Sequence, residues 1–270
     1  MSSSSQTGPA DADPHGTAPS QAGPCAVVLA AGKGTRMKSD LPKVLCPVVD
    51  RPMIHFVIDA LEKAGIKRQI VVVGYRADDV RAELETRPNH GIEFVVQHEQ
   101  LGTGHAVQCC RDQLATQTGP TVVVAGDSPL IQPSSLTTLL EHFASHQPSL
   151  LLGTLKKDDP SGLGRVVRDS EGAFMGIVEQ KDATPEQLQI KEVNMSTYLF
   201  RTRDLLNALA MLNNDNAQSE YYLTDCARLL RESGRPVEAV PALQACEALS
   251  INNPQELELV DQKMRAMGYA

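Results

Sequence analysis

The chain has 270 residues, a formal net charge of −8 and a hydrophobic content of 41%. This length supports one large domain or two small ones with a substantial core. The acidic balance argues against a nucleic-acid or membrane-surface partner, because both carry negative charge, and no apolar run approaches the roughly 18 residues of a membrane span.

The composition of the N-terminal residues and the spacing of the cysteines predict a cytoplasmic protein with a disordered N-terminal tail. Residues 1–24 are rich in Ser, Gly, Pro and Ala, and this predicts a disordered segment without the apolar core of a secretory signal. The six cysteines form no C-x-x-C motif, so we expect buried thiols in a reducing compartment rather than disulfides or a metal site.

From residue 25 to about residue 155, strand-like and helix-like segments alternate. The alternation predicts an α/β fold with a mostly parallel sheet and helices on both faces. Ligands in such folds bind at the carboxyl ends of the strands. The predicted strands are residues 26–29, 70–73, 92–96, 121–125 and 150–155. The predicted helices are residues 52–64, 77–85, 105–114 and 133–146.

A glycine-rich loop, residues 29–37 (Leu-Ala-Ala-Gly-Lys-Gly-Thr-Arg-Met), follows the first predicted strand. Its small residues allow successive backbone N–H groups to converge on an anion. The spacing fits neither a Walker A loop nor a dinucleotide-binding fingerprint. A plain strand-to-helix turn is the simpler alternative, but it leaves unexplained why four cations cluster with a single acid in this region. These charged residues are Lys33, Arg36, Lys38, Lys43 and Asp40.

This loop, together with Pro-Lys-Val-Leu at residues 42–45, resembles the signature of the sugar-1-phosphate nucleotidylyltransferases, and in particular of the uridylyltransferases that make UDP-N-acetylglucosamine. The resemblance implies a Rossmann-like, nucleotide-diphospho-sugar transferase fold with a smaller β-rich sugar-binding part. It also implies catalytic roles for Arg36 and Lys43. The loop residues that would bind the nucleotide are Leu29, Ala30, Ala31, Gly32, Gly34 and Thr35.

A second phrase, Gln-His-Glu-Gln-Leu-Gly-Thr-Gly-His-Ala at residues 97–106, follows the third predicted strand and is similar to the family's base-reading loop. An amide suits a pyrimidine edge because it offers both a donor and an acceptor. By resemblance, Gln97, Gly102 and Thr103 would hold uracil. A role for Thr103 as a helix N-cap is an alternative that is compatible with base binding.

Two oxygen-bearing side chains are candidate Mg²⁺ ligands. Asp127 follows the fourth predicted strand, where a carboxylate is well placed to share a hard cation with substrate phosphates; the simpler alternative is a surface turn residue. The family usually has Tyr where this chain has Ala125. By resemblance, Asn252 supplies the second ligand, although Asn253 equally fits as the cap of a helix that begins at Pro254.

Beyond residue 155, short strands and hairpins are predicted, and the phrases there resemble the family's sugar-binding region. Met195 and Ser196 depart from the usual Asn-Thr-Gly and add bulk. Tyr222 fits equally as an aromatic anchor for a helix at residues 223–230. The sugar-binding residues implied by the resemblance are Gly164, Glu179, Asn194, Tyr222 and Thr224.

The resemblance covers residues 25 to about 265, with a nucleotide-binding half (25–155), a sugar-binding half (156–252) and a C-terminal helix (253–270). The hexapeptide repeats of the family's acetyltransferase domain do not occur in the sequence. The implied reaction is Mg²⁺-dependent attack of N-acetylglucosamine-1-phosphate on the α-phosphate of UTP, which forms UDP-N-acetylglucosamine and pyrophosphate. The alternatives are a transferase for another sugar-1-phosphate or nucleotide, and a regulator that binds sugar nucleotides without turnover. The sequence leaves the oligomeric state open.

Overall fold

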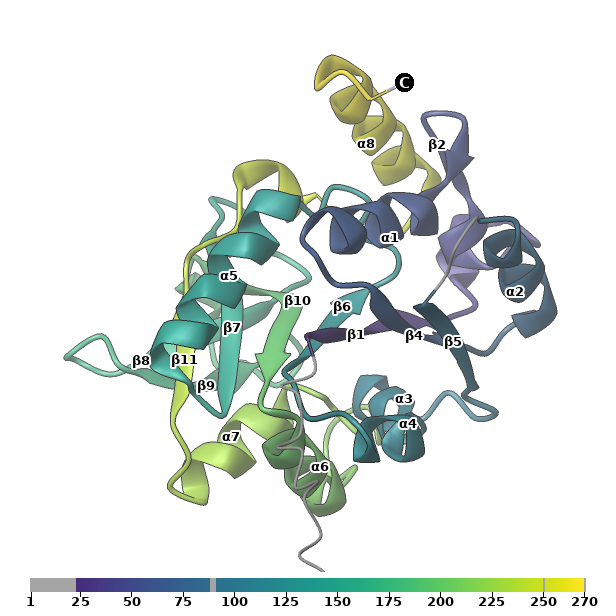
Figure 1. The fold of residues 1–270 in the computed structure, drawn as a ribbon. Coiled ribbons are helices and arrows are strands. Elements are labelled where there is room, and N and C mark those ends of the chain that lie inside the picture. Colours follow the sequence, from purple (N-terminus) through teal and green to yellow (C-terminus); the bar gives the residue numbers. More distant parts are fainter. Residues whose placement is uncertain (1–22, 88–90, 250, 270) are drawn as a thin grey trace, which may run out of the picture.

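The computed structural model describes residues 23–87, 91–249 and 251–269. Most of the predicted tail, residues 1–22, lies outside the described residues. Within these ranges the main sheet has nine strands, with the order β11-β7-β10-β6-β1-β4-β5 and a β8–β9 pair attached to β10 (Figure 1). The strands of the main path are β1 (Cys25–Ala30), β4 (Arg68–Val73), β5 (Gly91–Val96), β6 (Thr121–Ala125), β7 (Leu150–Lys156), β10 (Glu192–Phe200) and β11 (Val237–Val240).

The predicted mostly parallel sheet is confirmed. β6, β1, β4 and β5 run parallel to one another, and β11 runs parallel to β7. The four central strands are parallel because a helical crossover joins each to the next along the chain. All five predicted strands are present, each within about one or two residues of its expected bounds.

Helices cover both faces of the sheet (Figure 1). Alternate residues of β1 point to opposite faces, so Ala26 and Val28 pack in one core and Cys25 and Val27 in the other. One face carries α1 (Met53–Lys63), α2 (Ala77–Glu85) and α5 (Pro133–His146); the other carries α3 (Thr103–Gln108), α4 (Arg111–Ala115), α6 (Thr202–Met211) and α7 (Asp225–Glu232).

The predicted helix at 105–114 is wrong as a single element, because the chain forms α3 and α4 there. Cys110 leaves helical geometry with φ −87° and ψ 8°, and its N–H bonds to Val107 O rather than to the carbonyl four residues back. This tighter turn separates the two helices, both of which pack against α6. The helix expected at 223–230 begins instead at Asp225.

The region after residue 155 contributes more to the main sheet than expected. β8 (Gly164–Arg168) and β9 (Phe174–Val178) form the expected hairpin. β10, however, was not predicted as a strand, and it inserts antiparallel between β6 and β7. A bulge between Asn194 and Thr197 interrupts its pairing with β7. This bulge obscures the sequence pattern, because it breaks the alternation of inward and outward side chains.

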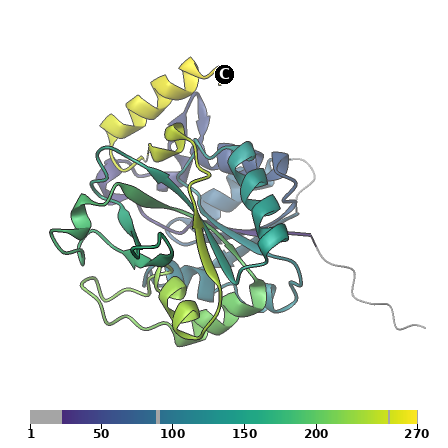
Figure 2. The same cartoon turned by 90° about the vertical axis from the view of Figure 1, so that its left-hand side faces the viewer.

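The C-terminal helix α8 (Pro254–Ala266) packs beside the small hairpin of β2 (Pro47–Val48) and β3 (Arg51–Pro52) at one end of the molecule (Figures 1 and 2). Asn253 caps α8, since its side chain accepts a hydrogen bond of 2.9 Å from the N–H of Glu256. Four short 3₁₀ turns complete the described elements: η1 (Thr35–Met37), η2 (Lys43–Leu45), η3 (Gln187–Gln189) and η4 (Ala245–Ala248).

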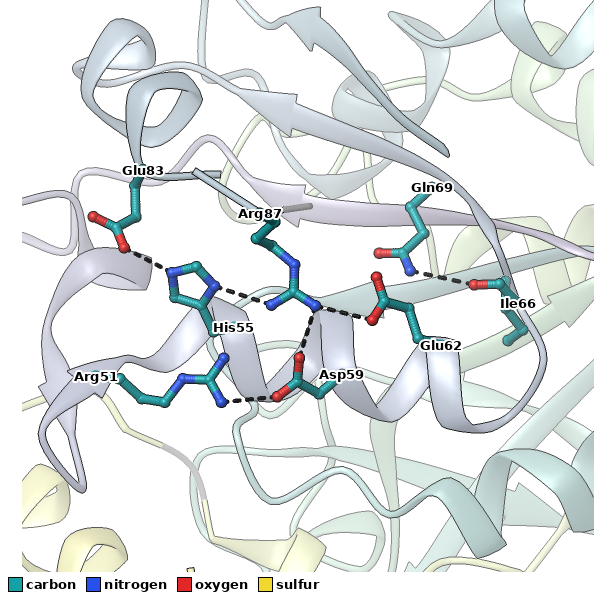
Figure 3. A network of polar contacts seen from close by, with 8 residues as sticks. All are labelled: Arg51, His55, Asp59, Glu62, Ile66, Gln69, Glu83 and Arg87. Atoms are coloured by element: carbon teal, nitrogen blue, oxygen red, sulfur yellow. Dashed lines mark hydrogen bonds and ion pairs between the residues drawn. The ribbon is translucent and has the colours of Figure 1, made fainter. Parts of the chain in front are cut away.

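A polar network ties α1 to the end of α2 (Figure 3). Arg87 donates to Asp59 at 2.7 Å, to Glu62 at 2.9 Å and to Nδ1 of His55 at 3.1 Å. Because arginine only donates, His55 accepts at Nδ1 and donates from Nε2 to Glu83 at 2.7 Å. Burial acts to raise the pKa of Asp59, but hydrogen bonds from Arg87 and Arg51 outweigh it and hold this pKa below its usual value.

In the described part of the chain, no helix combines the length and the apolar character needed to cross a membrane.

Candidate active site

The glycine-rich loop lies at the carboxyl end of β1, directly beside the end of β6. The N–H of Gly126 donates to Leu29 O at 2.9 Å, and a Cβ on Gly126 would lie 2.9 Å from that oxygen. Gly34 has φ 63°, and a Cβ there would lie 2.6 Å from Cβ of Lys43. These glycines therefore permit Asp127 and Lys43 to approach the loop closely.

The cationic and oxygen-bearing residues predicted for catalysis and metal binding converge. Nζ of Lys43 lies 2.5 Å from Oδ2 of Asp127 and 3.1 Å from Oδ1 of Asn252. Nη2 of Arg36 lies 3.2 Å from the same Asn252 oxygen. Lys33 is directed elsewhere, over the ring of Tyr75 at 5.2 Å from its centroid. Of these three cations, Arg36 and Lys43 therefore lie beside Asn252, and Lys33 lies against Tyr75.

Asp127 and Asn252 together fit a small hard cation. Their oxygens both contact one ammonium, so a cation close to that position would reach both of them. Mg²⁺ commonly takes one or two protein oxygens and completes its shell with water and substrate phosphates. Among the described residues there is no group of three or more His, Cys, Asp or Glu suited to a metal.

The predicted base-reading loop follows β5. Gln97 is 3% exposed, and its Nε2 lies 3.1 Å from Gly102 O and 3.1 Å from Nδ1 of His105. Gly102 has φ 106°, and a Cβ there would lie 2.7 Å from Tyr221 O. The alternative role of Thr103 as an N-cap is wrong, since Gly102 occupies that position. The Thr103 hydroxyl instead accepts from the N–H of Leu223 at 3.1 Å.

Four of the five residues predicted for sugar binding line a cavity of about 220 Å³ between β9, β10 and the segment before α7: Glu179, Asn194, Tyr222 and Thr224. Thr224 donates to Oε1 of Glu179 at 3.1 Å, and Asn194 donates to the Tyr198 hydroxyl at 2.6 Å. Burial raises the pKa of Glu179. Tyr222 lines the cavity, is 8% exposed, and accepts a hydrogen bond of 2.8 Å at its hydroxyl from Nε2 of Gln218.

Two further cavities adjoin this one through shared residues. A cavity of about 530 Å³ is lined by residues that include Arg36, Lys43, Asp127 and Asn252. One of about 290 Å³ is lined by residues that include Gln97, Gly102 and, from the glycine-rich loop, Leu29, Ala31 and Gly32. Ser196 lines all three, so we describe them together as the cleft. The predicted site residues that border none of these three cavities are Ala30, Gly34, Thr35 and Gly164.

Two residues that sequence reasoning missed support this site. Oε2 of Glu256 accepts hydrogen bonds from both the backbone and the side chain of Asn252. Asn253 and Glu256 have the spacing of a helix capping box, so the sequence could have indicated that Glu256 lies close to the start of this helix. His105 contacts Gln97 from within the base-reading phrase, but nothing in the sequence indicates which side chain its ring faces.

The mostly parallel α/β sheet carries a glycine-rich loop at the carboxyl end of β1, beside Lys43, Asp127 and Asn252. This arrangement fits the nucleotidyltransferase class. Residues 26–229 match the MobA-like NTP transferase domain, and the chain belongs to this family.

Individual relatives agree with this placement. The chain is 45% identical over 240 residues to the Bifunctional protein GlmU of an Exiguobacterium strain, and the match covers 89% of this chain and 52% of that protein. The chain therefore spans about half the length of the curated relatives it matches.

Two solved structures share the fold. One is described as a glucose-1-phosphate thymidylyltransferase of Bacillus anthracis in complex with sucrose (TM-score 0.75, 18% identity), and the match covers 92% of this chain and 97% of that one. The other is a UDP-glucose pyrophosphorylase complexed with UDP-glucose (TM-score 0.73, 17% identity), with 91% and 100% covered. At this identity the likeness concerns the fold alone.

Proposed function

We propose that this chain is a Mg²⁺-dependent uridylyltransferase that forms UDP-N-acetylglucosamine and pyrophosphate from UTP and N-acetylglucosamine-1-phosphate. The observation that carries the proposal is the position of the Lys43 ammonium between the oxygens of Asp127 and Asn252, beside the glycine-rich loop. The 45% identity to a Bifunctional protein GlmU supports the same activity.

In this reaction a phosphate oxygen of the sugar-1-phosphate attacks the α-phosphorus of UTP, and the bond to pyrophosphate breaks. The nucleophile is already an anion, so no general base is needed, and catalysis consists of positioning and charge neutralisation. Arg36 and the Gly32 backbone would neutralise the departing pyrophosphate, and Lys43 would contact the α-phosphate.

Asp127 and Asn252 would hold Mg²⁺, which when bound supplies positive charge to the phosphate oxygens at the reaction centre. Lys43 lies beside both of these oxygens, and Arg36 lies beside the Asn252 oxygen. The proposed division of labour is a nucleotide-binding half (25–155), a sugar-binding half (156–252) and a C-terminal helix (253–270) that follows the second metal ligand.

For the nucleotide, Leu29, Ala31 and Gly32 border the same cavity as Gln97 and Gly102. Ala30 is buried in the core, so only its backbone would serve the ligand; Gly34 and Thr35 would likewise act through the backbone of the loop. We assign uracil to the cavity beside Gln97 and Thr103.

For the sugar, Glu179 retains a carboxylate oxygen to accept from a hydroxyl, because Thr224 engages only the other one. Asn194 retains one amide N–H after its bond to Tyr198. Tyr222 would pack against the sugar ring, and Gly164 would offer its backbone to the acetamido group.

The six free cysteines support a reducing, cytoplasmic location.

A second candidate is a transferase for a different sugar-1-phosphate. The observation that favours it is Ser196, which replaces the family's usual glycine and borders the whole cleft. A regulator without turnover is less well supported, because a binding module needs neither Lys43 nor both metal ligands.

The test is pyrophosphate release from Mg²⁺ and UTP with N-acetylglucosamine-1-phosphate, glucose-1-phosphate or N-acetylgalactosamine-1-phosphate. The proposal expects rapid release only with N-acetylglucosamine-1-phosphate. Rapid release with another sugar supports the second candidate. Silence with every sugar, from a protein that still binds UTP, supports the regulator.

A further inference from the structure

The side-chain amide of Gln97 is held by two neighbours on the same side. Its Nε2 carries two hydrogens, and it lies 3.1 Å from Gly102 O and 3.1 Å from Nδ1 of His105. The side chain is 3% exposed, so an unpaired hydrogen there carries a desolvation cost. Among the described residues no side chain or backbone group engages Oε1 of Gln97. The amide therefore presents its oxygen, and not its nitrogen, to a ligand.

His105 is suited to act as the second acceptor. The amide nitrogen of Gln97, Nε2, can only donate. Nδ1 of His105 therefore accepts with its lone pair, and the ring proton of His105 is on the other ring nitrogen, Nε2 of His105. The ring extends from α3 and contacts the ring of Tyr221 with the centroids 6.3 Å apart. It lines a separate cavity of about 410 Å³ between α3, α4 and α6, and it borders none of the three cavities of the cleft in the described structure. Any effect of His105 on a bound nucleotide is therefore exerted through Gln97.

We propose that His105 is a positioning residue that sets base selectivity by fixing the orientation of the Gln97 amide; this inference rests on the proposed function. N3 of uracil carries a hydrogen, which Oε1 of Gln97 accepts. N3 of cytosine carries a lone pair, which the same oxygen repels. If the amide rotates by half a turn, its nitrogen faces the base and the preference reverses.

Gly102 O alone holds only one of the two Nε2 hydrogens. Without an acceptor at residue 105 the other hydrogen loses its partner, and the energetic difference between the two amide orientations shrinks. The loss appears as weaker discrimination between UTP and CTP. A residue that merely supports packing would change the use of both nucleotides equally.

The experiment compares kcat/KM for UTP and CTP, with saturating sugar-1-phosphate, in the wild type, His105→Phe and His105→Asn. Phenylalanine keeps the ring and removes the acceptor, whereas asparagine places an oxygen near the position of Nδ1. We expect His105→Phe to lower the UTP to CTP ratio roughly tenfold, the effect of one neutral hydrogen bond, and His105→Asn to retain it. His105→Leu, a second variant without an acceptor, replaces His105→Phe if that protein fails to fold. The control is Arg111→Ala on α4, whose exposed side chain lies in the same separate cavity.

A wild type that strongly prefers UTP, together with a non-accepting variant that keeps this preference, overturns the inference. Equal losses with UTP and CTP overturn it as well, because they indicate a structural role. A wild type without transferase activity on any nucleotide instead overturns the proposed function. In that case UTP and CTP affinities of the same variants, measured by calorimetry, still test the role of His105.

Discussion

One carboxylate oxygen of Glu256 holds Asn252 at two points. Oε2 of Glu256 accepts from the backbone N–H of Asn252 at 2.7 Å and from its Nδ2 at 3.1 Å. The amide nitrogen is thereby directed toward α8, and the amide oxygen is directed toward Arg36 and Lys43. A residue that sequence reasoning did not select thus orients a proposed metal ligand.

Glu256→Ala should therefore weaken the use of Mg²⁺. We expect the Mg²⁺ concentration for half-maximal activity to rise roughly tenfold, in the range of lost outer-shell partners, and Mn²⁺ binding followed by electron paramagnetic resonance to weaken in parallel. The matched control is Glu258→Ala, an exposed carboxylate two residues further along α8. Unchanged Mn²⁺ affinity in a folded Glu256→Ala protein would contradict this role.

Lys43→Ala should lower kcat more than it raises KM. The proposed function places the ammonium at the reaction centre, and the loss of one preorganised charge-stabilising donor costs about 10² to 10³-fold. The control is Lys38→Ala, which removes an exposed cation five residues earlier. Steady-state kinetics with UTP check the prediction, and a Lys43→Ala enzyme with near-normal turnover would remove Lys43 from the catalytic assignment.

Ser196 combines a position in the cleft with an unfavourable backbone conformation. Its φ is 54°, a region that favours glycine, and it lies within the bulge of β10. Ser196→Gly should raise the free energy of unfolding by about 1 kcal/mol and change the ratio of kcat/KM between N-acetylglucosamine-1-phosphate and glucose-1-phosphate.

Ser219 provides a matched control for this prediction. It also has φ 54°, but it is exposed and lines none of the three cavities of the cleft in the described structure. Ser219→Gly should give a similar gain in stability, measured by chemical denaturation, without a change in sugar selectivity. If both variants leave selectivity unchanged, Ser196 has no part in choosing the sugar.

Glu179 should destabilise the protein at neutral pH. Burial raises its pKa, so the folded state holds the proton more tightly than the unfolded state does. The destabilisation is absent below the unfolded pKa, develops as pH rises toward the folded pKa, and is complete above it. Glu179→Gln should therefore melt higher than the wild type at pH 7, with a difference that shrinks toward pH 4.

The same Glu179→Gln variant should bind the sugar-1-phosphate less well. In the amide, an NH₂ donor takes the place of one carboxylate oxygen, which is proposed to accept from a sugar hydroxyl. Glu171→Gln, an exposed site on the turn before β9, is the control for both measurements. A difference in melting temperature between Glu179→Gln and the wild type that does not vary with pH would show that the buried charge of Glu179 is not its cause.

Much of this protein is determined by its sequence. The periodicity of residues 25–155 predicts the parallel strands and their helices, because side chains buried on both faces of a strand read as short apolar runs. The family match agrees with the resemblance carried by the glycine-rich loop and the Gln97 phrase. These signals are local, since each depends on a few consecutive residues.

The tertiary structure decided which of those residues meet. Lys43 and Asn252 are 209 positions apart, and their contact depends on α8 packing against β2. The insertion of β10 places Ser196 at the junction of the three cavities. The contact between His105 and Gln97 required the orientation of α3. Such contacts are set by packing between elements distant in the chain, and no local pattern of side chains encodes them.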